Sequence, residues 1–228
     1  MSEHDPSYEA DVWNGIFAQR EWGKYPDLHV VRFIARSFFR EPDRSRVRIL
    51  EIGCGTGANL WFLAREGFGT YGLDGAAHAV EKAKARLDEE CPGWHGKVMV
   101  GDARDLPFEN DSFDAVIDME AISCNSFEDS RKIYSETARV LKPGGKMFSC
   151  CFAPHMTGYA TGEKVGHEMW VVEEGPLKGL GAVRFTPEED IPALCGDFII
   201  DALDHSETTQ FNKRIIVKEN IIIATVRK

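Results

Sequence analysis

EIGCGTGANL, residues 51–60, is the part of this 228-residue sequence that points most directly to an architecture. It follows a short β-rich run at residues 47–52, and its last residues open a segment with helical character. Glycines in such a loop allow a tight turn and let a ligand approach the backbone closely. The stretch therefore predicts a strand, a ligand-binding loop and a helix in succession. The alternative is that the glycines only shape the turn between strand and helix.

Strands and helices continue to alternate downstream of this loop. Strand-like runs at residues 70–73, 97–100, 113–118 and 146–152 are separated by helical patterns at 58–66, 76–90 and 130–141. This alternation is typical of a doubly wound α/β fold, with a mostly parallel sheet and helices on both faces. Two β-rich runs, residues 198–203 and 215–226, close the chain and must pair as antiparallel neighbours if their connection is short.

We expect one domain, residues 1–228, with four regions. Residues 1–45 form an N-terminal helical lid, in which Asp27 caps the second helix, and residues 46–152 form the cofactor-binding core. Residues 153–186 leave the sheet on the substrate side, with a short hairpin near 169–172. Residues 187–228 supply a closing helix, whose start is marked by the sequence TPEED at 186–190, and the terminal strand hairpin.

Composition excludes several classes of protein. The net charge of −10 argues against nucleic-acid binding through phosphate neutralisation. No apolar run reaches the roughly 18 residues of a membrane helix, and residues 1–9 are too acidic and polar for a signal peptide. The six cysteines form no Cys-x-x-Cys pair, and no cluster of ligand residues has metal-site spacing, so we expect a cytoplasmic protein with reduced thiols and no metal.

The acidic residues beside the glycine loop indicate the kind of cofactor. Asp74, at the end of the second strand, can hydrogen-bond the two hydroxyls of a ribose. Glu51 would repel a pyrophosphate but could hold an ammonium group. Asp102, after the third strand, could accept from the amine of an adenine. The Gly-x-Gly-x-Gly spacing also differs from the Gly-x-Gly-x-x-Gly of dinucleotide loops, so these features favour an adenosine with an amino-acid tail.

At this point the sequence resembles a known family, the class I S-adenosylmethionine-dependent methyltransferases, especially the group that modifies small molecules. The resemblance is carried by EIGCGTG at 51–57, GLDG at 72–75, GDARDLPF at 101–108, SFDAVI at 112–117 and RVLKPGGK at 139–146. It implies S-adenosylmethionine as cofactor, a small-molecule substrate, and a seven-stranded sheet with an antiparallel last strand. The terminal hairpin agrees with such a sheet.

The resemblance also implies roles for individual residues. Those expected around the cofactor are Glu51, Gly53, Cys54 and Gly55 at the methionine end and sugar, Asp74 at the ribose, Gly75, Asp102 and Ala103 at the adenine, and Asp118 and Met119 below the transferred methyl. Gly75 departs from the family pattern, because many relatives have a hydrophobic side chain there that packs on the adenine.

Methyl transfer from a sulfonium is an in-line displacement, so the protein mainly aligns the nucleophile and excludes water. A base is needed only where the nucleophile must lose a proton. His155, just past the fifth strand, is our first candidate for the base, and Tyr159, His167 and Glu168 are weaker ones. Each could equally be a solvated loop side chain. The aromatic residues Trp13, Phe17, Trp22 and Tyr25 either cover the ligands or pack against the sheet.

Other functions remain open on the sequence. An NAD-dependent oxidoreductase has a related sheet, but Glu51 and Asp102 argue against it. A non-catalytic scaffold could keep the cofactor loop. The charge disfavours an RNA methyltransferase, and the fourth strand ends in Ile117-Asp118-Met119-Glu120 in place of an Asn-Pro-Pro-Tyr signature. A protein substrate, the identity of the acceptor atom and the oligomeric state are all undetermined.

Overall fold

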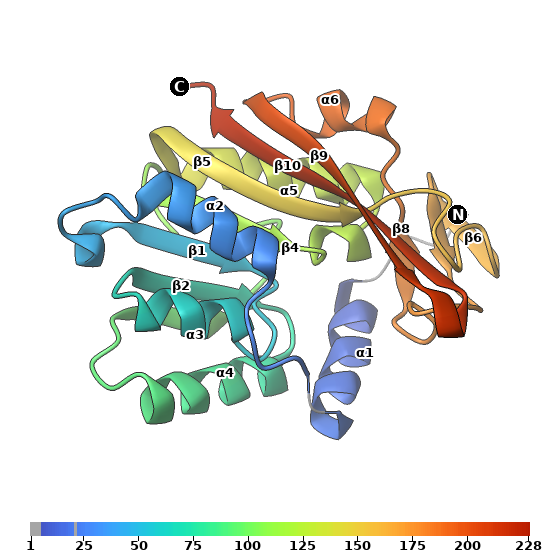
Figure 1. The fold of residues 1–228 in the computed structure, drawn as a ribbon, viewed down its shortest axis with the longest axis horizontal. Helices are drawn as coiled ribbons and strands as arrows, with labels where there is room; N and C mark the ends of the chain where they lie inside the picture. The colour runs from blue at the N-terminus through green and yellow to red at the C-terminus, as the bar shows by residue number, and fades with distance from the viewer. Residues whose placement is uncertain (1–5, 21) are drawn as a thin grey trace.

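The computed structural model describes residues 6–20 and 22–228 and is built around a seven-stranded sheet (Figure 1). The strand order is β3-β2-β1-β4-β5-β10-β9. All neighbours run parallel except β10, which is antiparallel to both β5 and β9. The strands are β1 Arg48–Ile52, β2 Gly69–Asp74, β3 Gly96–Val100, β4 Phe113–Met119, β5 Leu141–Phe152, β9 Phe198–Gln210 and β10 Ile215–Val226. This confirms the predicted doubly wound, mostly parallel sheet.

Helices cover both faces of the sheet. The α-helices are α1 Pro6–Gln19, α2 Leu28–Phe38, α3 Ala58–Arg65, α4 Ala77–Glu90, α5 Phe127–Val140 and α6 Ile191–Leu194. Short 3-10 helices are η1 Arg44–Arg46, η2 Ile122–Cys124, η3 Glu188–Asp190 and η4 Phe211–Lys213. Side chains of α2, α3 and α4 pack into one core cluster, and those of α5 and α6 into the other. Helix α1 packs beside the end of α4, to the left of the tip of the β9–β10 hairpin (Figure 1).

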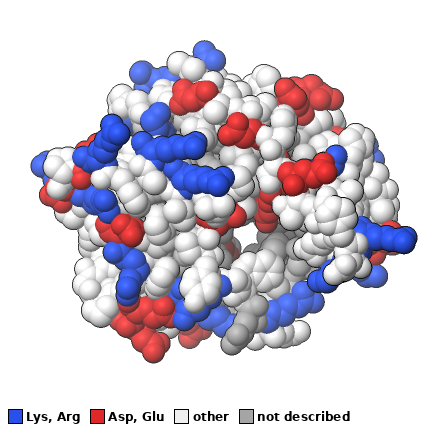
Figure 2. All heavy atoms as spheres, in the orientation of Figure 1, with Lys and Arg blue, Asp and Glu red and all other residues white. Residues whose placement is uncertain are grey.

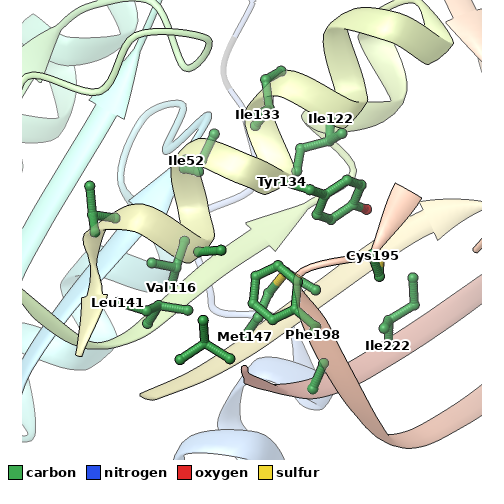
Figure 3. Close-up of a cluster of buried hydrophobic side chains, with 14 of the residues drawn as sticks. Ile52, Val116, Ile122, Ile133, Tyr134, Leu141, Met147, Cys195, Phe198 and Ile222 are labelled. Carbon is green, nitrogen blue, oxygen red and sulfur yellow. The ribbon is translucent and has the colours of Figure 1, made fainter. Parts of the chain in front are cut away.

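The core beneath α5 and α6 holds the ends of the central strands in place. Figure 3 shows Ile133 and Tyr134 of α5 and Cys195 beside Met147 and Ile222 of the sheet. Burial of such side chains removes apolar surface from water and is the main force that fixes a helix on a sheet. The cores on both faces therefore fix the positions of the loops that follow the strands.

Local signals in the sequence set where these helices start. The side chain of Asp27 accepts a hydrogen bond from the backbone N–H of His29 at 2.7 Å, which confirms the predicted cap of α2. Ser126 caps α5 in the same way and accepts from Asp129 N at 3.1 Å. Each cap satisfies an N–H that has no partner inside the helix.

The region after β5 is more structured than the sequence predicts. A separate antiparallel sheet, β6-β7-β8, comprises β6 Glu163–Gly166, β7 Met169–Val171 and β8 Ala182–Arg184. It has its own small apolar core, which includes Trp170, Val183 and Phe185. The helix expected from residue 186 is short, because η3 leads into the four-residue α6.

Two further findings concern the whole described chain. Every helix there is too short or too polar to cross a lipid bilayer. None of the six cysteines, which all lie in the described part of the chain, forms a disulfide, and all but Cys124 are buried.

Candidate functional site

A cavity of about 870 Å³ lies at the carboxyl ends of the parallel strands. Its walls include the residues that follow β1, β2, β3 and β4, where a doubly wound sheet normally binds its ligand. Acidic side chains surround a hollow near the middle of the face in Figure 2. The cavity has two halves, one lined by glycines and acids and one lined by apolar side chains.

The glycine loop forms the floor of the first half. Gly53 and Gly55 have φ values of +65° and +51°, a region that side chains rarely adopt. A Cβ on Gly53 would lie 2.1 Å from the Cβ of Ala121, so no other residue fits there. The N–H groups of Gly53 and Cys54 both donate to Leu73 O, at 2.7 and 3.1 Å. The loop is thus tied to the end of β2 and keeps its shape without a ligand.

Glu51 is the most unusual charge in this half. Its side chain is buried, and its Oε1 accepts a hydrogen bond from Asn59 Nδ2 at 2.7 Å. The other oxygen, Oε2, is buried without any hydrogen-bond partner. Burial raises the pKa of Glu51 to about 8, against the effect of Asn59, and the nearby charges of Asp74 and Asp118 raise it further. An unpaired acid in this position fits a ligand that brings a positive charge.

Asp74 is held by the loop that it faces. Its Oδ2 accepts from Gly55 N and its Oδ1 from Ala76 N, both at 2.8 Å. Burial raises the pKa of Asp74, and the two backbone N–H groups oppose that shift. Each carboxylate oxygen can still accept another hydrogen bond, so the group can bind a pair of hydroxyls in a fixed orientation.

Asp102 is a more exposed acid than Asp74. Its carboxylate is engaged by Arg104, with Nη2 donating to Oδ2 at 2.6 Å. The hydrogen bond from Arg104 lowers the pKa of Asp102. Of the residues that the sequence assigns to the cofactor, the cavity lining contains Glu51, Gly53, Cys54, Gly55, Asp74, Gly75, Asp102, Ala103 and Met119.

Asp118 is the exception in that set. It is buried behind the cavity and does not line it. Its Oδ2 accepts from Ser149 Oγ at 2.6 Å and its Oδ1 from Ile122 N at 3.0 Å. Burial raises the pKa of Asp118 to about 6 despite these bonds. Of the two residues expected near the transferred methyl, Met119 therefore lines the cavity and Asp118 does not.

An aromatic cluster closes the cavity from the N-terminal side. Trp13, Phe17 and Trp22 contact one another, with ring centroids 5.5 to 5.7 Å apart. All three line the cavity, and so does Tyr25. Helix α1 is fastened to α4, because His78 N donates to Asn14 Oδ1 at 3.0 Å and Lys82 Nζ donates to Phe17 O. The sequence left open whether these aromatic residues cover the ligands or pack against the sheet. In the structure they cover the cavity.

The second half of the cavity was not identified from the sequence. Its lining is mostly apolar and comes from β5, the region after it, and β10: Phe152, Met156, Pro176, Leu177, Leu180, Val183 and Val217. These positions are far apart in the chain and share no motif. Glu120, directly after β4, lies in the same lining. The one available signal was that Phe152 is the last residue of β5 and Glu120 directly follows β4.

His155 does not line this cavity. It lies in a separate hollow of about 480 Å³, together with Tyr159, His167, Glu168 and His205. His167 Nε2 is 2.8 Å from Asp190 Oδ2, and Tyr159 OH donates to Glu168 Oε2 at 2.8 Å. The structure therefore brings the four candidate residues together, but away from the cofactor loop.

Comparison with known proteins supports the expected family. The methyltransferase domain family matches residues 49–145. The chain is 36% identical over 102 residues to a phthiotriol/phenolphthiotriol dimycocerosates methyltransferase of Mycobacterium leprae. The matched region covers 44% of this chain and 36% of that protein. The chain is also 36% identical over 108 residues to a demethylmenaquinone methyltransferase of Clavibacter sepedonicus, 46% of this chain and 41% of that protein. The chain thus spans less than half the length of these curated relatives.

Solved structures share the fold over a greater length. A magnesium protoporphyrin IX methyltransferase from Synechocystis with bound SAM superposes with a TM-score of 0.68 at 17% identity, over 99% of both chains. A SAM-dependent methyltransferase from Methanosarcina mazei gives a TM-score of 0.66 at 23% identity, over 78% of this chain and 92% of that one. The predicted resemblance is confirmed for residues 49–145 by the family match, and the solved structures confirm the expected fold.

Proposed function

We propose that this chain, in which residues 49–145 form a class I methyltransferase domain, binds S-adenosylmethionine and transfers its methyl group to a small apolar molecule. One observation carries the proposal: a single cavity joins a half lined by glycines and acids to a half lined by apolar side chains. The mycobacterial, menaquinone and porphyrin methyltransferases named above support an acceptor of this kind.

The donor fits the first half on physical grounds. S-adenosylmethionine supplies a methyl group that is already activated on a sulfonium, together with an ammonium group. Glu51 Oε2, buried and unpartnered, is the acceptor that we assign to that ammonium. Asp74 binds the ribose hydroxyls, and Asp102 with Ala103 binds the adenine. A dinucleotide would bring a pyrophosphate to this loop and no ammonium group for Glu51.

The acceptor half orients the nucleophile and excludes water. Phe152, Val217 and the aromatic cluster of α1 enclose the space in front of Met119. Within such an enclosure the acceptor is held in line with the methyl–sulfur bond, which converts the reaction into a step between prepositioned groups.

The first test is calorimetric titration with S-adenosylhomocysteine, with NADH as the control ligand. We expect micromolar binding of S-adenosylhomocysteine and no binding of NADH. Radiolabelled methyl transfer to a set of apolar acceptors then tests turnover. Binding of NADH alone would favour an oxidoreductase, and binding of S-adenosylhomocysteine with no transfer to any acceptor would favour a scaffold.

A further inference from the structure

Glu120 lies where the two halves of the cavity meet and is held there in an unusual backbone conformation. Its φ is +66°, a value uncommon for a residue with a side chain. The backbone is fixed on both sides, since Glu120 N donates to Cys150 O at 2.9 Å and Ser123 N donates to Glu120 O at 3.2 Å. The left-handed turn thus places Glu120 in the lining of the cavity, directly after Met119.

A second carboxyl group, that of Glu219, lies close to the carboxyl group of Glu120. Glu219 lies on β10 two residues after Val217, so both side chains leave the same face of the strand. Val217 lines the cavity, whereas Glu219 does not. A carboxylate oxygen of Glu120 and one of Glu219 lie within 4.8 Å of each other. Two negative charges this close repel each other, which favours a proton on one member of the pair.

The groups around this pair favour a proton on Glu120. Burial is the main cause that raises its pKa, followed by the nearby carboxyl group of Glu219 and by the charges of Asp118 and Asp27. These neighbours come from β10, from β4 and from the residue before α2. On β5, the Cys150 thiol lies within 4.8 Å of both carboxyl groups, and burial raises its pKa and keeps it neutral.

We propose that Glu120 accepts the proton of a hydroxyl group on the acceptor and passes its own proton to Glu219. This inference rests on the proposed function and narrows the acceptor to an apolar molecule that carries a hydroxyl. The oxygen–hydrogen bond breaks and its proton moves to one oxygen of Glu120, while the proton already on Glu120 moves from its other oxygen to the Glu219 carboxylate. The oxygen forms a bond to the methyl carbon, and the methyl–sulfur bond breaks with its electron pair left on sulfur.

The chemistry of the site favours a hydroxyl over an ammonium group. A hydroxyl needs one hydrogen-bond acceptor and loses little solvation among the side chains of Phe152, Leu177 and Val217. A buried ammonium would need several acceptors, and the shared proton leaves the carboxyl pair with a single negative charge. A neutral hydroxyl is also a weak nucleophile, so its methylation requires a base that removes the proton.

The test uses matched naphthalenes on the full chain saturated with S-adenosylhomocysteine. The probes are 2-naphthol, its methyl ether 2-methoxynaphthalene, and the cation 2-naphthylmethylamine. We expect the wild type to bind 2-naphthol about tenfold more tightly than the ether, the effect of one hydrogen bond to a charged group. The preference should disappear in Glu120→Leu and persist in Glu207→Gln, an exposed acid paired with Lys218 on β10.

A spectroscopic signature separates proton transfer from simple packing. In protein labelled with ¹³C at the glutamate carboxyls, the resonance lost in Glu120→Gln reports on Glu120. We expect it to titrate above the ordinary glutamate range and to respond to 2-naphthol but not to the ether. In Glu219→Gln, which keeps the size of the side chain and removes its charge, the titration should move to lower pH, and so should the acid limb of any naphthol methylation.

Each contrary result has a distinct meaning. If S-adenosylhomocysteine or both neutral naphthalenes fail to bind, the proposed function itself fails. Equal affinity for naphthol and ether, or an unchanged titration in Glu219→Gln, overturns the role of Glu120 alone. If the cation binds more tightly than 2-naphthol and this binding depends on Glu120, the acceptor carries an amine and not a hydroxyl. Zinc binding that requires Glu120, Cys150 and Glu219 would assign the cluster to a metal and also overturn the inference.

Discussion

Asn59 donates a hydrogen bond to one oxygen of Glu51 and leaves the other oxygen buried without a partner. Asn59 is itself held by the start of α2, because Asp27 N donates to its Oδ1 at 3.0 Å. The N-terminal region thus fixes the orientation of an acid at the end of β1. The free protein bears the cost of this arrangement, since burial raises the pKa of Glu51 to about 8.

This raised pKa predicts how stability changes with pH. From about pH 5 to 8 the folded protein keeps a proton on Glu51 that the unfolded chain releases, so the free energy of unfolding falls as pH rises. Glu51→Gln removes the titration and should gain on the order of 1–3 kcal/mol at pH 8.5, with little gain at pH 5. Urea unfolding of both proteins at the two pH values measures the difference.

Asp118 contributes to the same trend, because its pKa is raised to about 6. The decline should therefore become shallower in Glu51→Gln without disappearing. Equal slopes of stability against pH in the variant and the wild type would show that Glu51 is ionised in the free protein and would remove the argument for its raised pKa.

Replacing Asp74 should weaken cofactor binding. Asp74→Ala removes the acceptor for Gly55 N and Ala76 N as well as the predicted ribose contact. We expect a loss of about 1–3 kcal/mol in S-adenosylhomocysteine affinity, measured by calorimetry. Asp102→Ala is the matched comparison and should cost less, because the Asp102 side chain is half-exposed and already paired with Arg104. An Asp74→Ala protein with wild-type affinity would exclude the ribose assignment.

The aromatic cover should report on the ligand through its fluorescence. Trp13 and Trp22 line the cavity, so S-adenosylhomocysteine should change their emission. The change should shrink in Trp22→Phe and remain in Trp94→Phe, because Trp94 lies elsewhere and donates to Asp88. Phe17→Ala should weaken binding by about three- to tenfold through lost packing. If emission is unchanged on saturation, α1 does not contact the bound ligand.

A buried arginine should hold the region after β5 on the core. Arg184 is fully buried on β8, and it donates to Thr186 Oγ1 at 2.8 Å and to Ser130 Oγ on α5 at 3.1 Å. Arg184→Leu leaves these partners unsatisfied and should cost about 1–3 kcal/mol in urea unfolding. Protease cleavage within residues 153–186 should also become faster. Arg131→Leu, an exposed change on α5, serves as the control and should leave both readouts near wild type.

Much of the fold was predictable because the local signals agree with the sheet. From β1 to β5 each predicted strand and helix overlaps an observed element. The prediction failed where pairing does not depend on apolar residues. Strand β9 continues past Leu203 to Gln210 through exposed polar residues, because the edge of a sheet needs only backbone partners. Strand β6 is exposed throughout and carries no apolar signal.

The residues of the candidate site also divide into those that the sequence predicts and those that it does not. Residues of the cofactor half lie directly after consecutive strands, so their sequence positions alone bring them to one edge. Val217, Leu177 and Phe152 meet only because β10 inserts beside β5 and the second sheet folds back over the strand ends. No spacing in the chain encodes that contact. The spacing of residues in the chain also does not indicate that His155 lines a separate hollow.

The boundary between the two halves of the cavity lies close to the limits of the family match. The family match covers residues 49–145, which supply the glycine loop and the acids. The aromatic cover and most of the apolar wall come from segments on either side of that range. On the proposed function, mutation of these flanking segments can redirect the enzyme to a new acceptor while the donor remains held as before. A shared core can thus hold the methyl donor while different flanking segments shape the pocket for the acceptor.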